Sequence, residues 1–180
     1  SIEKMISQMR NTCYLCTKRF NDKYILFDRG ELMNVTLKRI DASNFIDCFN
    51  LKLANGQEAF VSHPIRSLAQ AYVYYNQCIP FGIYYEDFMV GYVMVLYDYD
   101  EEEYHIWHMM IDEKYQGKGY GKAAMHKCLE FIATKPFGNS NRVVLTCDEM
   151  NGKAIGLYKS LGFVPTGSVD EDEIELSLTI

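Results

Sequence analysis

The chain has 180 residues, of which 48% are apolar and 23% charged, a composition typical of one folded domain with its own core. Its net charge of −6 argues against a nucleic-acid partner, because binding phosphates requires clustered Lys and Arg, whereas an acidic surface attracts a cationic small molecule. No apolar run approaches the roughly 20 residues of a membrane span, and the polar first residues do not resemble a signal peptide. We therefore expect a cytoplasmic protein without a membrane partner.

Residues 1–32 differ in charge from the rest and are interpreted as an N-terminal extension of uncertain role. Residues 1–33 carry six basic and four acidic side chains, a net charge of +2, which leaves −8 for the remainder. The extension is either an added helix–strand element or a consequence of how the gene start was assigned. Its Cys13 and Cys16 form a C-x-x-C pair, which could bind zinc or be redox-active. Zinc would need a second such pair, which the sequence lacks, so no metal site is expected.

From residue 33 to residue 180, strand and helix patterns alternate, and these residues are predicted to form the main domain. Ser43 is expected to cap the first helix, and Pro64 to begin the second. The predicted elements, in chain order, are a strand over 35–40, a helix from 45, a helix over 65–75, a hairpin of 81–85 and 89–97, a strand over 104–111, a helix over 118–134, a strand over 142–147, a helix over 152–161 and a final hairpin of 163–168 and 174–179. This order predicts a mixed α/β fold with helices packed on a central sheet.

A glycine-rich loop, residues 111–122, joins the strand over 104–111 to the next helix. Gly117, Gly119 and Gly121 stand at alternate positions, so the backbone can turn sharply and bring its N–H groups close to an anion. The start of the helix adds partial positive charge, and Lys118 and Lys122 add full charges. The loop therefore suits a phosphate or pyrophosphate. Its spacing matches neither the Walker loop nor the Rossmann G-x-G-x-x-G pattern.

Two motifs together point to a family. Gln116, Gly119 and Gly121 form a Q-x-x-G-x-G pattern that resembles the acetyl-CoA pyrophosphate loop of the GNAT superfamily of N-acetyltransferases. About thirty residues on, 151–163 resemble that family's N-x-x-A-x-x-x-Y-x-x-x-G-F segment at every defined position. The resemblance implies a GNAT domain over 33–180, with about six to seven strands flanked by about four helices. It also implies strands that splay apart at the acetyl-CoA site.

The resemblance further implies acetyl-CoA as cosubstrate and a set of residues that bind it. Strand backbone, chiefly at Met109 and Ile111, should pair with the pantetheine arm as another strand would. The residues expected to bind the cofactor are Met109, Met110, Ile111, Gln116, Gly117, Lys118, Gly119, Tyr120, Gly121, Lys122, Asn151, Lys153, Ala154 and Tyr158.

Segments in the middle of the chain point to one group of enzymes within this superfamily. These segments, residues 51–53, Gln57, 60–61, 67–72, 80–84 and 89–92, are similar to the bacterial spermine/spermidine (diamine) acetyltransferases of this superfamily. The resemblance implies a small cationic amine as acceptor, such as spermidine or spermine. Trp107, whose ring face can attract a cation, and the acidic pair Glu86 and Asp87 are expected to bind it. Family members often pair through sheet edges, so a homodimer is also expected.

The catalytic assignments begin with Tyr158, which stands at the family's general-acid position and can donate a proton to the departing CoA thiolate. The base is left open, because enzymes of this type tend to carry a carboxylate on the strand before the glycine loop, and none follows Glu103 here. His105, His108 and a water relay to Glu103 are the alternatives. Strand alternation predicts His105 and Trp107 on one face of the sheet, with His108 on the other.

Other functions stay open from the sequence. A GNAT enzyme acting on another amine, such as an amino acid, a peptide N-terminus or an aminoglycoside, would carry the same two motifs. A non-catalytic CoA-binding sensor is the alternative of another class, and the absence of a strand carboxylate beyond Glu103 keeps it open. A third alternative is a site for another nucleotide phosphate.

Overall fold

The structure, a computed structural model, describes residues 34–170 and 172–180. The predicted extension at 1–32, with its Cys13 and Cys16 pair, lies outside these residues. Within them, no group of three or more His, Cys, Asp or Glu side chains is placed to hold a metal ion. No helix of this part of the chain is both long and apolar enough to cross a membrane.

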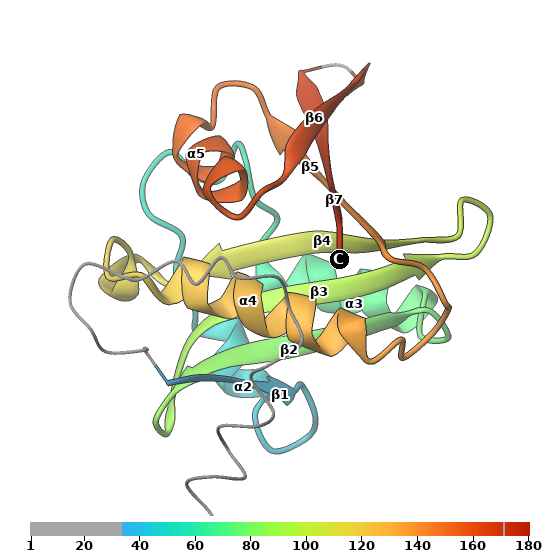
Figure 1. Cartoon of the computed structure of the whole chain (residues 1–180). Helices are drawn as coiled ribbons and strands as arrows, with labels where there is room; N and C mark the ends of the chain where they lie inside the picture. Colours follow the sequence, from blue (N-terminus) through green and yellow to red (C-terminus); the bar gives the residue numbers. More distant parts are fainter. Residues whose placement is uncertain (1–33, 171) are drawn as a thin grey trace, which may run out of the picture. The chain divides into compact units, whose positions relative to one another are not determined.

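Seven strands form one mixed sheet in the order β1-β2-β3-β4-β5-β7-β6, and four α-helices accompany it in the described ranges (Figure 1). The strands are β1 Val35–Arg39, β2 Cys78–Tyr85, β3 Phe88–Asp98, β4 Glu103–Ile111, β5 Arg142–Asp148, β6 Val164–Asp170 and β7 Glu173–Thr179. The helices are α2 Phe45–Phe49, α3 Pro64–Val73, α4 Tyr120–Ala133 and α5 Gly152–Ser160, and a 3-10 turn, η1, covers Glu113–Tyr115. The predicted mixed α/β arrangement is confirmed.

Local signals explain most of the helix starts. Pro64 occupies the first turn of α3, and the Asn151 side chain accepts a hydrogen bond of 3.2 Å from the Ala154 N–H at the start of α5. The prediction that Ser43 caps α2 is wrong: Asn44 is the N-cap, and the Ser43 hydroxyl donates to Asp41 instead. Helix α4 begins at Tyr120 rather than at residue 118, because Gly119 has a left-handed backbone with φ of 90°.

Each face of the sheet packs its own core. The larger core lies between the sheet and α4, with α5 at its margin, and the smaller core lies on the opposite face, where α2 and α3 pack (Figure 1). Neighbouring residues of β3 illustrate the division, since Val93 belongs to the first core and Met94 to the second, and both are fully buried. We call these two sides the α4 face and the α3 face.

Strands β4 and β5 run parallel and pair at only two positions, Tyr104 with Val143 and His105 with Val144. Beyond His105, β4 pairs only with β3, as far as Ile111, while β5 continues along β7 to Asp148. We call the two stretches that diverge, residues 106–111 of β4 and 145–148 of β5, the β4–β5 fork. The expected splaying of strands is thus present, and it leaves one edge of β4 without a neighbouring strand among the described residues.

Candidate active site

The open edge of β4 presents backbone groups to the fork. Met110 pairs with Tyr92, and its carbonyl points at β3, because a Cβ atom added to Gly91 would lie only 2.4 Å from that oxygen. Backbone groups alternate along a strand, so those of Met109 and Ile111 point the other way, into the fork. The Ile111 carbonyl already accepts a hydrogen bond of 2.9 Å from the Gln116 side chain. Met109 therefore offers both its N–H and its C=O to a ligand, and Ile111 offers its N–H.

The glycine loop continues this edge into the start of α4. Gly117 and Gly119 both have positive φ, of 72° and 90°, a conformation that other residues adopt only with strain. No acceptor in the described part of the chain takes up the backbone N–H groups of Gly117, Gly119 or Gly121. The first N–H groups of a helix have no partner within it and carry partial positive charge. The loop thus presents several free donors together, as an anion site requires.

Side chains at both ends hold the loop in place. Gln116 and Gln57 exchange two hydrogen bonds, of 2.8 Å and 3.3 Å, across 59 residues of sequence. The buried Asp112 carboxylate accepts from the backbone N–H groups of Lys52 and Lys114, at 2.9 Å and 3.0 Å. The Gln116 amide is consequently engaged with the protein, so its contribution to a ligand is to position the loop.

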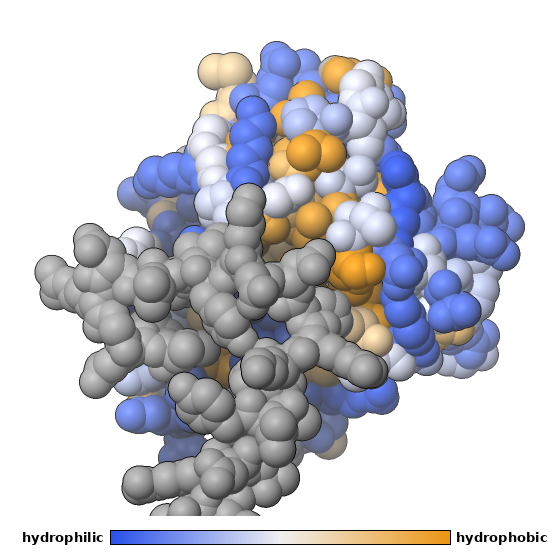
Figure 2. Space-filling view, in the orientation of Figure 1, coloured by the Kyte–Doolittle hydropathy of each residue, from blue (hydrophilic) through white to orange (hydrophobic). Residues whose placement is uncertain are grey.

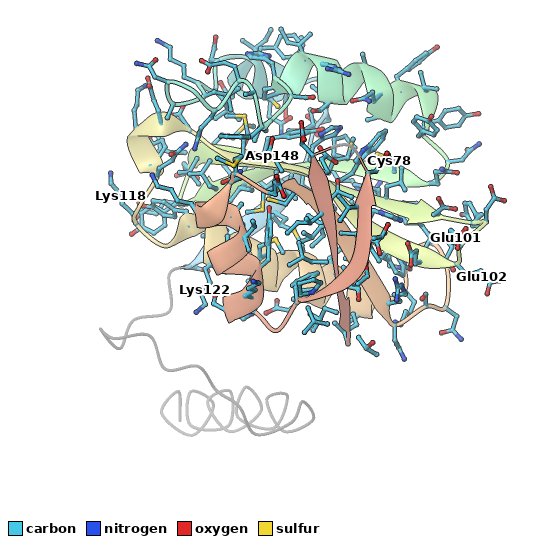
Figure 3. The ribbon with its side chains drawn as sticks, turned by 90° about the horizontal axis from the view of Figure 1, so that it is seen from above. Cys78, Glu101, Glu102, Lys118, Lys122 and Asp148 are labelled. Carbon is cyan, nitrogen blue, oxygen red and sulfur yellow. The ribbon has the colours of Figure 1, made fainter. Side chains whose placement is uncertain are left out.

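The predicted cofactor residues contribute in different ways. Lys118 is exposed and lies with Lys122 on the side of the domain away from the Glu101–Glu102 turn (Figure 3). Tyr120 is buried, with its ring packed against Tyr85 and Tyr115, so it can offer a ligand only its backbone. The buried side chain of Met110 lies in the core of the α3 face, so its contribution is also limited to backbone. On α5, Lys153 is exposed and Ala154 is partly buried beside the Asn151 cap.

Tyr158 approaches the fork from the α4 face. Burial raises the pKa of Tyr158 well above its usual value, and the neighbouring Cys147 thiol raises it further. Cys147 belongs to the β5 arm of the fork, so the Tyr158 hydroxyl lies beside that arm. No hydrogen bond from a described residue contributes to this pKa shift. The hydroxyl stays protonated at neutral pH and is free to donate.

The α3 face of the fork differs from the prediction. A β-bulge in β4 sets Ile106 opposite Val95 and His108 opposite Met94, so Trp107 is the extra residue. The Trp107 and His108 rings stack with centroids 4.9 Å apart, and the His108 ring contacts Gln70 of α3. The prediction that the two side chains lie on opposite faces is wrong, because the bulge shifts the alternation by one residue. Trp107 also packs edge-on against Tyr74, at 5.5 Å.

His108 is held as a neutral ring. Its Nε2 lies 3.0 Å from the Gln70 Oε1, which can only accept, so Nε2 carries the proton and Nδ1 is the basic atom. Burial, with a smaller effect from Arg66, lowers the pKa of His108 to about 4. A base with this pKa is neutral at pH 7 but retains a captured proton only weakly.

His105 and Glu103 lie where β4 and β5 are still paired, before the fork opens. The Glu103 carboxylate contacts Arg142 Nε at 2.5 Å and His105 Nε2 at 3.2 Å. Arg142 also reaches Glu175 on β7, at 3.5 Å. These ion pairs tie the closed end of the fork together, so both predicted base candidates have structural partners here.

This geometry can be compared with known proteins. The model of the Acetyltransferase (GNAT) family matches residues 46–163. The chain belongs to the GNAT acetyltransferase family. It is 30% identical to a spermine/spermidine N(1)-acetyltransferase of Bacillus subtilis over 146 residues, which cover 77% of this chain and 93% of that protein.

Solved structures share the GNAT fold. A spermidine N-acetyltransferase from Vibrio cholerae in complex with CoA and spermine has a TM-score of 0.61 at 18% identity, over 81% of this chain and 95% of that one. The ribosomal-protein-S18-alanine N-acetyltransferase of Escherichia coli has a TM-score of 0.59 at 20% identity, over 81% and 94%. At these identities the likeness shows the fold alone. The chain is thus a GNAT N-acetyltransferase with a seven-stranded mixed sheet in its described residues.

Two of the predicted acceptor residues lie apart from the third. Glu86 and Asp87 form the exposed turn between β2 and β3, and Glu86 has a positive φ of 54°. Tyr120, which packs on the α4 face, has a raised pKa, mainly because of burial and its tyrosine neighbours. The Glu86 charge makes a smaller contribution to this shift. Trp107 lies on the α3 face. The structure therefore does not group these three residues into one acceptor site.

Sequence reasoning also missed a carboxylate at the fork. Asp148 is the last residue of β5 and is only partly buried. It stands next to Cys147, which packs on the α4 face, so the Asp148 side chain belongs to the α3 face. The alternation of apolar residues along 143–148 could have predicted which face of the sheet the Asp148 side chain occupies. Its place beside β4, however, follows only from the strand order.

Proposed function

We propose that this GNAT N-acetyltransferase uses acetyl-CoA to acetylate a primary amine of a small cationic acceptor, a polyamine such as spermidine or spermine. The observation that carries the proposal is the β4–β5 fork, where the open backbone edge at Met109 continues into the free N–H groups of the glycine loop. The name of the B. subtilis relative and the spermine in the V. cholerae complex support the choice of acceptor.

The residues at the fork fit acetyl-CoA. The N–H groups of Gly117, Gly119 and Gly121 would bind its pyrophosphate, with charge from Lys118 and Lys122. The backbone groups of Met109 would pair with the pantetheine amides, and the start of α5 at Asn151 would flank them. When bound, acetyl-CoA supplies the thioester that the amine attacks. An N–H group directed into the fork can stabilise the negative charge that develops on the acyl oxygen.

Two proton transfers accompany the reaction. Alkyl ammonium groups have a pKa of about 10, so the acceptor must lose a proton before its nitrogen can attack. Tyr158, protonated and without a partner in the described chain, would protonate the departing thiolate. Neutral His108 can accept a proton at Nδ1 for transfer onward to water.

The deciding experiment measures the release of free CoA thiol from acetyl-CoA in the presence of a panel of amines. Spermidine, spermine and putrescine are compared with amino acids, peptides bearing free N-termini and aminoglycosides. Saturable turnover with polyamines supports the proposal, and its loss in Tyr158→Phe supports the acid. Turnover only with another class of amine would refute the polyamine assignment. CoA binding without turnover on any acceptor would favour a sensor.

We also propose that the enzyme is a cytoplasmic homodimer and that residues 1–32 form an extension outside the GNAT domain. Strand β6 lies at the edge of the sheet with every residue exposed, including Val164 and Val169. On the face that carries α4, apolar residues appear among hydrophilic ones at the surface (Figure 2). An exposed edge strand with apolar side chains is a natural surface for pairing with a second copy. Light scattering on the full chain and on residues 33–180 tests whether the enzyme is a dimer and whether the dimer depends on the extension.

A further inference from the structure

The α3 face of β5 and β7 carries a row of carboxylates. Three residues of β5, Val143, Leu145 and Cys147, pack in the core of the α4 face, and the residues between them therefore face the other way. Residues directly opposite each other on neighbouring strands share a face. Asp148 pairs with Glu173 and Thr146 pairs with Glu175, so all four side chains lie on the α3 face.

These carboxylates differ in whether a cation balances them. Glu175 is paired with Arg142, which also pairs with Glu103, so both carboxylates at the closed end of the fork contact a cation. Among the described residues, no Lys, Arg or His forms an ion pair with Asp148 or with Glu173. Like charges directly opposite each other destabilise a sheet, so this pair is unfavourable in the protein alone. A cationic ligand between them would relieve the repulsion.

Asp148 also lies level with the open edge of β4. It stands five residues beyond Val143, which pairs with Tyr104. The bulge at Trp107 adds one residue to β4, so the residue at the same level along that strand is Met110, between Met109 and Ile111 of the open edge. Cys147, beside Asp148, borders Tyr158 on the α4 face. The Asp148 carboxylate and the Tyr158 phenol therefore lie at the β5 arm of the fork on opposite faces of the sheet. This arrangement gives the carboxylate a place on the acceptor side of the reaction.

The side chain is oriented for such a contact. Asp148 Oδ1 accepts a hydrogen bond of 2.7 Å from the Met150 N–H, which fixes the carboxylate at the end of the strand. Oδ2 has no partner in the described part of the chain. Glu173 is exposed beside it, and on β4 the Trp107 ring lies on the same face. A chain with positive charges separated by methylene groups would find carboxylates and an aromatic surface here.

We propose that Asp148 binds the acceptor nitrogen that enters the fork and that Glu173 binds the next ammonium group of the same molecule. The pair thereby selects amines with two cationic nitrogens over amines with one. This inference rests on the proposed function and adds the residues that set its specificity. Both residues act by binding the acceptor, and neither contacts the cofactor loop.

The test compares charge removal at three positions. Asp148→Asn keeps an oxygen for the Met150 N–H, and Glu173→Gln keeps the size of an exposed side chain. The control is Glu101→Gln, which removes the same charge at the β3–β4 turn, far from Asp148 (Figure 3). Spermidine affinity is measured by calorimetry with CoA present, beside steady-state kinetics. Cofactor affinity and melting temperature are measured for each variant, so that a folding defect is recognised.

Asp148→Asn and Glu173→Gln are each expected to weaken spermidine binding about tenfold, the effect of losing one charge-assisted contact. Glu101→Gln should change it less than about twofold, and Asp148→Glu, which restores the charge, should recover part of the affinity. Wild-type affinity in the first two variants would overturn the inference, as would an equal loss in all three. If the wild type neither binds nor acetylates polyamines, the proposed function fails instead. The same variants are then measured with the amine that is turned over, and unchanged binding there overturns the inference as well.

Discussion

The two sides of the β4–β5 fork offer a ligand different kinds of groups. On the cofactor side, the groups directed at a ligand belong to the backbone, at Met109 and at the glycines of the loop before α4. On the α3 face they are side chains from several strands, with Trp107 on β4, Asp148 on β5 and Glu173 on β7. Backbone groups suit a constant ligand, because they survive most substitutions. Side chains suit a ligand that varies between enzymes of one fold.

This difference predicts how each side responds to change. The cofactor side depends on dihedral angles, so substitutions there matter when they alter φ or loosen the loop. The acceptor side depends on charge and on strand register, so substitutions that preserve shape but remove charge should be effective. Tyr158 stands between the two sides, and loss of its hydroxyl alone should affect chemistry, because the ring that packs beside the cofactor site is kept.

The largest expected effect is that of Tyr158→Phe. Loss of the phenol removes the proposed proton donor for the leaving thiolate, and general acid catalysis contributes about 10²–10⁴-fold. We expect kcat to fall by at least about 10²-fold, while calorimetric affinities for CoA and spermidine stay at wild-type values. Because burial and Cys147 raise the pKa of Tyr158, the wild-type activity should show no loss from phenol ionisation up to pH 9. A variant with normal kcat would assign the acid to another group.

How much of this was predictable depends on how local each feature is. Gly119 and Asn151 act on the helices that they begin, so a short motif sufficed to find them. The face of His108 depends on a bulge opposite β3, and no residue near His108 signals it. The role proposed for Asp148 depends on its position relative to β4 and on its pairing with Glu173, which lies 25 positions further along the chain. Sequence patterns recover backbone sites well, but they miss side-chain sites assembled from several strands.

A second prediction concerns the left-handed glycines. Gly119→Ala should cost about 1–2 kcal/mol of stability, because its φ of 90° is strained for alanine, and it should also weaken CoA binding by about tenfold or more. Gly167→Ala is the matched control, since Gly167 also has a φ of 90° and an added Cβ meets no atom within 4 Å. That control should lose similar stability in urea titrations but keep its CoA affinity. Equal CoA affinity in both variants would show that the loop conformation is not required.

A third prediction concerns the pH dependence of stability on the α3 face. Burial and Arg66 lower the pKa of His108 to about 4, against an ordinary value near 6.5. Between these values the unfolded chain binds a proton that the folded chain does not, so the free energy of unfolding falls as pH drops from 6.5 to 4. His108→Gln removes this contribution while keeping a donor for Gln70. Thermal melts at pH 7.5 and pH 5 should show a smaller loss of melting temperature in the variant, by a few degrees.

His126 provides the internal reference for that experiment. Burial also lowers its pKa, but it is present in both proteins and cancels from the difference. If the melting temperature falls by the same amount on acidification in the wild type and in His108→Gln, the low pKa of His108 is refuted.

The smallest expected effect tests whether the cofactor side of the fork can be perturbed without changing the acceptor side. Gln57→Ala removes both hydrogen bonds to Gln116, which keeps its bond to the Ile111 carbonyl and so holds the loop less firmly. A net loss of about 1 kcal/mol corresponds to a fall in CoA affinity of about fivefold. Gln57→Glu retains an oxygen for the 2.8 Å bond and should lose less. Spermidine affinity should not change in either variant, because the proposed acceptor residues Asp148 and Glu173 lie on β5 and β7, whereas Gln57 lies in the segment between α2 and α3. A parallel loss of both affinities would show that the two sides of the fork are coupled.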